Sequence, residues 1–304
     1  MGYPVKKIDR FVTEEFASII SEKANRIIFN IYCDYFSHIT YEEFEAQNLF
    51  HESVVMKCAA YRFADPELLH DILYTNAIKH TNLFTTENTL IHPIFYLRKS
   101  KKYATESDCK DDYFLDGQPH YDRSFNMPAQ SFWLALRDAN IQTGGLCFFE
   151  EGLDQLFNIK WGEKNKYSTS MYQSEYQKLD PSIIPRVIHP DIKSGGAYTF
   201  NSNELHGSTK PISDTRLSFD FRILLSSELK KIDERSKRLI LNFNDNIALT
   251  NAKNLFLMGD VKGASKYIKN YKLNPEDIVS IKQLHAAPKN NQLLHWSAEY
   301  SFIN

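Results

Sequence analysis

The sequence predicts a mainly β fold, an antiparallel double-sheet jelly roll with helices added at both ends. Short apolar segments separated by glycine-containing turns follow one another from about residue 90 to 226, without alternating helices. Helical periodicity is confined to the segments before and after them. Aromatic residues make up 13% of the chain, a share typical of β-rich proteins.

The N-terminal part predicts helices over about 13–80. Thr13 suits an N-cap, and two glutamates follow it where negative charge favours a helix start, so a helix is expected over 13–30. A capping-box pattern precedes a second helix at about 41–51. A third helix is expected from Pro66 onward, because proline is tolerated in the first helical turn.

The jelly-roll core is expected over about 90–226, which completes one domain over 1–226. Its predicted strands are 90–99, 131–137, 145–149, 184–189, 196–201 and 216–225. A polar insert at about 153–182 leaves the rim of this core and either covers the substrate or is a variable surface excursion.

Residues 227–304 predict a C-terminal helical extension packed on the core. Two or three helices are expected, broken at Gly259-Asp260 and at Gly263. A homodimer contact through these helices is a further hypothesis.

The composition predicts a soluble, cytoplasmic protein, and a small-molecule substrate is the expected partner. Net charge is −2, from 36 basic and 38 acidic residues without long runs of one sign, which argues against a nucleic-acid partner. No stretch approaches the roughly 20 apolar residues of a membrane span. The four cysteines have neither zinc-site spacing nor a disulfide pattern, as expected in a reducing compartment.

Two short segments carry candidate metal ligands. His120 and Asp122 are two positions apart, so in an extended segment their side chains point to the same side. His206 is the best candidate for a third ligand. Two histidines and one carboxylate leave coordination positions open for a co-substrate and dioxygen, which is the arrangement used by ferrous oxygenases.

Arg216 opens a segment in which polar and apolar residues alternate up to Ile223, and Leu225 continues the apolar face. The pattern predicts a strand with one apolar face and one charged face. A guanidinium that points into a partly closed core needs an anion, and its planar fork suits a carboxylate. Arg216 and Ser218 are therefore expected to hold the far carboxylate of a dicarboxylic co-substrate.

Together, His120-Tyr-Asp122, His206 and Arg216-Leu-Ser218 resemble the iron(II)/2-oxoglutarate-dependent oxygenases, and the segments between them are similar to the phytanoyl-CoA dioxygenase-like branch. The resemblance covers roughly residues 115–225. It implies a double-stranded β-helix, cupin-like core and the cofactors Fe(II), 2-oxoglutarate and O2, with iron held by the two histidines and Asp122. By the same resemblance, Trp133 and Ser208 contact 2-oxoglutarate.

One departure from that branch concerns the substrate. The family pattern after the GG strand is a proline-glycine-serine-histidine segment, whereas this chain continues with Glu150-Glu-Gly-Leu-Asp. The substrate class is therefore not carried over. The resemblance implies hydroxylation of a C–H bond, with succinate and CO2 as co-products, and a small polar metabolite or biosynthetic intermediate is the expected substrate.

Two other functions remain open on the sequence. One is a jelly-roll protein that binds a metabolite or carbohydrate without turnover. The other is a cupin-type metal enzyme that does not use 2-oxoglutarate, which would need no Arg216 to hold a distal carboxylate. The fold alone does not separate these three functions.

Overall fold

A computed structural model describes residues 5–35, 38–46, 53–82, 84–92, 95–100, 117–120, 129–149, 187–188, 190–201, 204–209, 211–231 and 247–274. Its strands are β1 (Lys6–Ile8), β2 (Thr89–Ile91), β3 (Tyr96–Lys99), β4 (Gly117–His120), β5 (Gln130–Ala135), β6 (Leu146–Phe149), β7 (Val187–Ile188), β8 (Ala197–Asn201), β9 (His206–Ser208) and β10 (Leu217–Leu225). Its helices are α1 (Glu14–Tyr35), α2 (Tyr41–Ala46), α3 (Ser53–Phe63), the π-helical η2 (Glu67–Tyr74), α4 (Thr75–Lys79), the 3-10 helix η6 (Ser226–Lys231), α7 (Ile247–Leu257) and α8 (Val261–Asn270).

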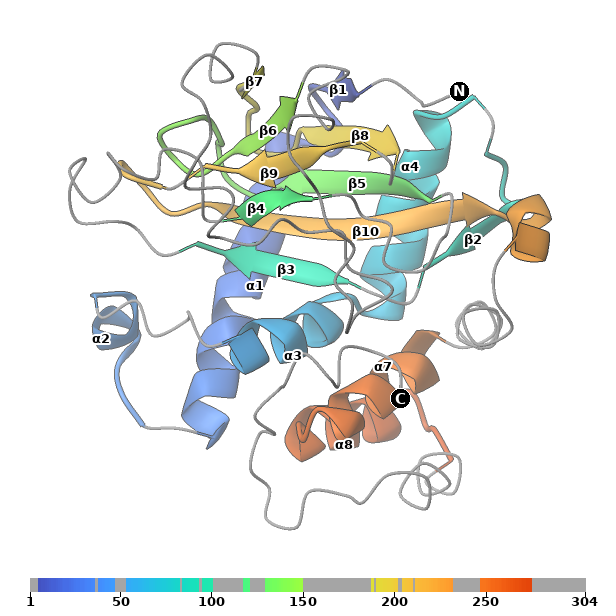
Figure 1. Cartoon of the computed structure of the whole chain (residues 1–304). Helices are drawn as coiled ribbons and strands as arrows, with labels where there is room; N and C mark the ends of the chain where they lie inside the picture. The colour runs from blue at the N-terminus through green and yellow to red at the C-terminus, as the bar shows by residue number, and fades with distance from the viewer. Residues whose placement is uncertain are drawn as a thin grey trace, which may run out of the picture.

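Two antiparallel sheets form the centre of the molecule (Figure 1). The larger has the order β1-β8-β5-β10-β2, with β3 also pairing with β10, and the smaller has the order β4-β9-β6-β7. Phe148 of the smaller sheet packs edge-on against Tyr198 and Phe200 of the larger, so the sheets share an apolar layer. Helices flank this β centre as the sequence predicts. The described strands do not close into a barrel, and the jelly-roll connectivity stays a prediction.

Strand β10 has one face in the core formed with the helices and the other face toward the space between the sheets. Leu217, Phe219, Phe221 and Ile223 are fully buried on its outer face, where they join the core formed with the helices. Phe219 packs edge-on against Phe63 of α3 at a ring-centroid distance of 4.9 Å. The alternate residues face the space between the sheets, as the period of two in the sequence predicts.

The predicted N-terminal caps are present. The Phe16 backbone N–H donates to Thr13 Oγ1 at the start of α1. The capping box before α2 is reciprocal, because the Glu43 N–H donates to Thr40 Oγ1 and the Thr40 N–H donates to Glu43 Oε2. The helix expected from Pro66 forms as η2 and α4.

Several elements differ from the sequence prediction. Helix α3 and the short strands β1, β4 and β9 were not predicted, and α1 continues to Tyr35 rather than ending at 30. The single strand predicted over 90–99 is wrong, since β2 and β3 pair separately with the two ends of β10. Pro93 lies between them in the sequence, and a proline provides no N–H to continue a ladder.

Gly263 does not break a helix, contrary to the prediction, because it lies inside α8. A Cβ at this position would stand 2.5 Å from Asp260 Oδ2 and 2.6 Å from Arg62 Nε. Glycine is needed here because α8 begins against a buried ion pair. The predicted break at Gly259-Asp260 is confirmed, and Asp260 caps α8 by accepting from the Gly263 N–H.

The Asp260 carboxylate joins the C-terminal helices to the N-terminal ones. It accepts two hydrogen bonds from Arg62 of α3, at 2.7 Å and 2.6 Å, and one from the Tyr35 hydroxyl at 2.8 Å. Arg62 also donates to Asp34. Buried residues of α7 and α8 belong to the same hydrophobic core as the outer face of β10. The division into a domain over 1–226 and an extension over 227–304 remains a prediction.

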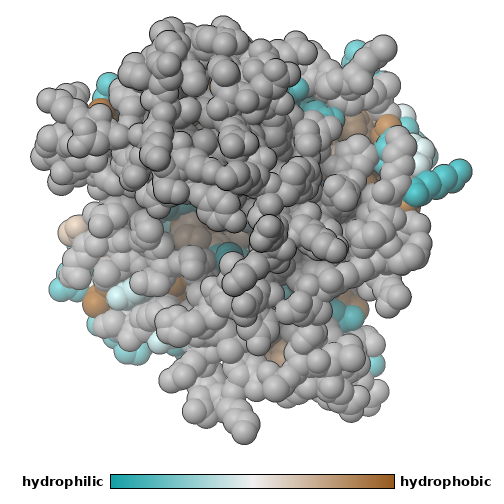
Figure 2. All heavy atoms as spheres, in the orientation of Figure 1, coloured by the Kyte–Doolittle hydropathy of each residue, from teal (hydrophilic) through white to brown (hydrophobic). Residues whose placement is uncertain are grey.

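The insert at 153–182 lies outside the described residues, as do most of the polar segment before His120 and the last thirty residues of the chain. None of the described helices combines the length and apolarity that a bilayer crossing requires. The large hydrophobic residues that are exposed in the described ranges, Ile19, Tyr41, Ile188 and Tyr271, come from separate elements. In the space-filling view the coloured surface accordingly mixes hydrophilic and hydrophobic residues (Figure 2).

Replacing Arg62 with methionine should destabilise the fold, because Asp260 would remain buried without its guanidinium partner. We expect a loss of about 3 kcal/mol in the free energy of unfolding, measured by urea denaturation. The matched control is Arg26→Met, which removes an exposed pair with Glu22 and should leave the unfolding midpoint unchanged. Equal midpoints for the two variants would contradict a stabilising role for the buried pair.

Candidate metal and co-substrate site

The backbone brings two of the predicted metal ligands together. Strands β4 and β9 pair antiparallel, and His120 stands directly opposite His206 in their register. These residues are separated by 86 positions in the chain, so only the pairing of two short strands makes them neighbours. Asp122, the predicted carboxylate ligand, lies outside the described residues. Among the described residues, no group of three His, Cys, Asp or Glu side chains is placed to hold a metal.

The hydrogen bond made by the His206 ring favours a tautomer that can bind a metal through Nε2. Its Nδ1 lies 2.9 Å from the backbone oxygen of Glu204. A carbonyl oxygen only accepts, so Nδ1 carries the proton and the ring lone pair is on Nε2. Histidine ligands are commonly held in this way by a hydrogen bond from the other ring nitrogen. The ring is 5% exposed and packs against Phe200 at 4.7 Å between centroids.

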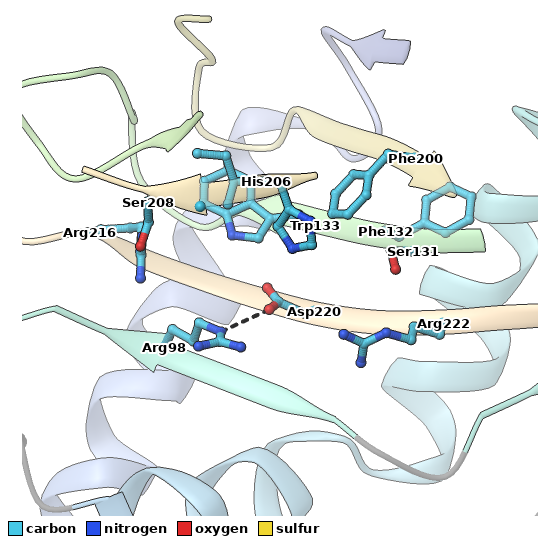
Figure 3. A pocket seen from close by; sticks show the side chains of 12 residues that line it. Arg98, Ser131, Phe132, Trp133, Phe200, His206, Ser208, Arg216, Asp220 and Arg222 are labelled. Carbon is cyan, nitrogen blue, oxygen red and sulfur yellow. Dashed lines mark hydrogen bonds and ion pairs between the residues drawn. The ribbon is translucent and has the colours of Figure 1, made fainter. Parts of the chain in front are cut away.

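A pocket between the sheets brings four predicted site residues together. His206 and Ser208 come from β9, Trp133 from β5, and Arg216 directly precedes β10 (Figure 3). Ser218 is on the same face of β10, two residues beyond Arg216, and is fully buried, but it is not among the residues that line the pocket. The pocket thus gathers one predicted metal ligand with Trp133, Ser208 and Arg216, three of the residues expected to contact 2-oxoglutarate.

Arg216 is a buried cation held at the wall of this pocket. It is 5% exposed, and its Nη1 donates to the backbone oxygen of Gly144 at 2.6 Å. Its backbone N–H donates to the Ser100 hydroxyl. A guanidinium at the wall of a pocket can bind a carboxylate ligand through charge-assisted hydrogen bonds.

Two buried donors beside Arg216 indicate a ligand that accepts hydrogen bonds. Trp133 Nε1 and Ser218 Oγ have no hydrogen-bond partner within the described part of the chain. Leaving such groups unsatisfied costs about 1–3 kcal/mol each. 2-Oxoglutarate carries two carboxylates and a ketone, all acceptors, so its chemistry fits this set of donors.

The pocket contains one charged residue that the sequence did not single out. Arg98 of β3 donates from Nε to Asp220 Oδ2 at 2.9 Å. Arg98 and Arg222 both lie over the Tyr96 ring, at 4.7 Å and 5.2 Å from its centroid. The signal that could have found Arg98 is the alternation of Tyr96 and Arg98 around the buried Leu97, which marks a strand with one polar face.

Asp220 is the acidic side chain among the described pocket residues. Burial raises the pKa of its carboxyl, while Arg98, Arg222 and Arg216 act in the opposite direction. Asp220 stands directly opposite Trp133 in the pairing of β10 with β5. Both side chains therefore belong to the same wall of the pocket (Figure 3).

No protein-family model and no curated protein matches this chain. Among solved structures it is similar to EvdO2 from Micromonospora carbonacea var. aurantiaca, with 12% identity and a TM-score of 0.44 over 72% of this chain and 85% of that one. It is also similar to the non-haem α-ketoglutarate-dependent epimerase SnoN, with 12% identity and a TM-score of 0.39 over 72% and 78% of the two chains.

EvdO2 has also been solved in complex with 2-oxoglutarate, and SnoN in complex with Fe3+ and α-ketoglutarate. A further similar structure is EctD from S. alaskensis, with 14% identity and a TM-score of 0.40 over 74% of each chain. The function of this chain is inferred below from its own residues.

Substituting His206 with glutamine tests whether β9 supplies a metal ligand. We expect anaerobic calorimetry to show iron(II) binding to the wild type and a dissociation constant at least about 100-fold weaker in His206→Gln, because a ligand is lost. His80→Gln is the matched control, since this ring packs on Phe11 and is not among the pocket residues. Equal affinity in both variants would exclude His206 as a ligand.

Proposed function

We propose that this protein is an iron(II)/2-oxoglutarate-dependent oxygenase that hydroxylates a C–H bond of a small polar metabolite or biosynthetic intermediate. Succinate and CO2 are the co-products. The observation that carries the proposal is the shared pocket of His206, in its metal-binding tautomer, and the buried Arg216. His206 would supply a nitrogen atom to the metal, and the Arg216 guanidinium would supply the positive charge that binds a carboxylate of the co-substrate.

His120, Asp122 and His206 would hold the iron. When bound, iron(II) with 2-oxoglutarate and O2 supplies the oxidising power for C–H cleavage, which no protein side chain provides. Asp122 fills the carboxylate position of the triad, which favours hydroxylation over halogenation. The Glu204 carbonyl keeps the Nδ1 proton in place and so holds the His206 ring in one orientation.

Arg216 would hold the distal carboxylate of 2-oxoglutarate, with Ser218 beside it on β10. Ser208 and Trp133 line the same pocket and would contact the co-substrate as the resemblance implies. Phe200 and Leu146 form apolar parts of the wall, so these polar contacts are made where little water competes. A cytoplasmic location and a homodimer formed through the C-terminal helices remain predictions.

The two alternative functions make different demands on these residues. A metabolite-binding jelly roll without turnover does not require His206 in a metal-binding tautomer. A 2-oxoglutarate-independent metal enzyme would use His206 but has no role for a buried Arg216. The pocket holds both residues, which favours the oxygenase.

The first test is the visible spectrum of the anaerobic protein with iron(II) and 2-oxoglutarate. We expect the weak metal-to-ligand charge-transfer band of the chelate in the wild type and its loss in His206→Ala. Asp122→Ala should abolish substrate-coupled turnover of 2-oxoglutarate, measured as succinate release. Iron binding without the band would favour the 2-oxoglutarate-independent enzyme, and no iron binding would favour the binding protein.

Arg216→Met should chiefly raise the apparent KM for 2-oxoglutarate, because the distal carboxylate loses its charged partner. We expect an increase of about 10- to 100-fold, the effect of losing a hydrogen bond between charged groups. Arg137→Met is the matched control, since Arg137 bonds to Thr215 outside this pocket. The co-substrate assignment fails if the two variants have the same KM in the succinate assay.

A further inference from the structure

Asp220 has one carboxylate oxygen that the protein leaves unsatisfied. Oδ2 accepts from Arg98 at 2.9 Å. Oδ1 is buried and has no hydrogen-bond partner among the described residues. The side chain projects from β10 into the pocket, on the wall that it shares with Trp133 (Figure 3). A buried acceptor without a donor is costly, so Oδ1 indicates a hydrogen-bond donor in the ligand.

The proposed co-substrate does not meet this requirement. At neutral pH the two carboxylates and the ketone of 2-oxoglutarate are all acceptors, and none of them donates. It can satisfy Trp133 Nε1 and Ser218 Oγ, which are donors, but it offers nothing to Asp220 Oδ1. Within the proposed function, the donor is therefore assigned to the substrate.

The charges of the pocket indicate which kind of hydrogen-bond donor the ligand would present to Asp220 Oδ1. Its described wall contains three guanidinium groups, of Arg98, Arg216 and Arg222, and one carboxylate, of Asp220. Within the proposed function the co-substrate's carboxylate pairs with Arg216, so an ammonium group at Oδ1 would stand near the guanidinium groups of Arg98 and Arg222, and like charges repel. A neutral donor avoids that repulsion.

A hydroxyl fits better than an amide N–H, because a hydroxyl both donates and accepts. Arg222 lies two residues beyond Asp220 on the same face of β10, so its N–H groups border the same region of the pocket. A hydroxyl that donates to Asp220 presents its oxygen to a wall rich in such donors. The nitrogen of an amide donates but does not accept, so it could not also accept a hydrogen bond from these guanidinium groups.

We propose that Asp220, oriented by Arg98, binds a hydroxyl group of the substrate, so that this enzyme acts on a hydroxylated compound such as a sugar or polyol derivative. The proposal rests on the oxygenase function above and names its substrate class. Arg98 is a positioning residue in this arrangement. Its bond to Oδ2 leaves Oδ1 directed to the ligand.

The test uses the full-length protein loaded anaerobically with iron(II) and 2-oxoglutarate. The probes are monosaccharides and cyclic polyols, each paired with the deoxy compound that lacks one hydroxyl. Binding is followed by the perturbation of the charge-transfer band, and turnover by succinate release. The variant is Asp220→Asn, and the matched control is Asp138→Asn, whose carboxylate bonds to Lys193 at the surface.

We expect at least one hydroxylated probe to bind the wild type about tenfold more tightly than its deoxy partner. Asp220→Asn should remove that preference, and Asp138→Asn should keep it. The wild-type comparison stands even if Asp220→Asn does not fold. Equal binding of the paired probes, binding of none of them, or an unchanged preference in Asp220→Asn would each overturn the proposal.

A fall in 2-oxoglutarate affinity in Asp220→Asn, without any change in probe preference, would also overturn it, since Asp220 would then serve the co-substrate. If the proposed oxygenase function is wrong, a different experimental result is expected. In that case the wild type shows no charge-transfer band, and thermal-shift measurements without iron would still show whether Asp220 distinguishes the paired probes.

Discussion

The alternation of β10 is the constraint on which the rest of the structure depends. A strand presents successive side chains to opposite faces, so one continuous segment serves both the core and the pocket. Phe219 and its apolar neighbours seal the sheet against the helices, while Arg216 and Asp220 face the second sheet. A shift of one residue in the pairing with β5 or β3 would bury guanidinium groups among phenylalanines. The hydrophobic core therefore holds the register that positions the site.

Burying charged side chains between two sheets costs free energy unless other groups replace their hydrogen bonds to water. The fold provides part of this compensation, through the Gly144 carbonyl for Arg216 and through Arg98 for Asp220. Trp133 Nε1, Ser218 Oγ and Asp220 Oδ1 remain without hydrogen-bond partners among the described residues. Two of these atoms belong to donor groups and one is an acceptor. A single acceptor-only ligand cannot satisfy all three atoms.

The helices give this pocket a rigid support. Residues of α3, α7 and α8 belong to the same core as the outer face of β10. The buried Arg62 and Asp260 pair then fixes how the C-terminal helices meet the N-terminal ones. Gly263 shows how close that contact is, because any larger residue would collide with the pair. The C-terminal helices thereby support the sheet from the face opposite the pocket.

The sequence by itself determined the elements whose signals are local. The capping pattern at Thr40, the helical period of α1 and the alternation of β10 depend on neighbours within a few positions, so they were predicted. Only the tertiary structure decided the pairing of β4 with β9, which sets His120 opposite His206, and the approach of Arg98 to Asp220. Strands of three or four residues carry too little periodicity to be recognised, and contacts between distant segments arise only when strands pair and buried faces pack.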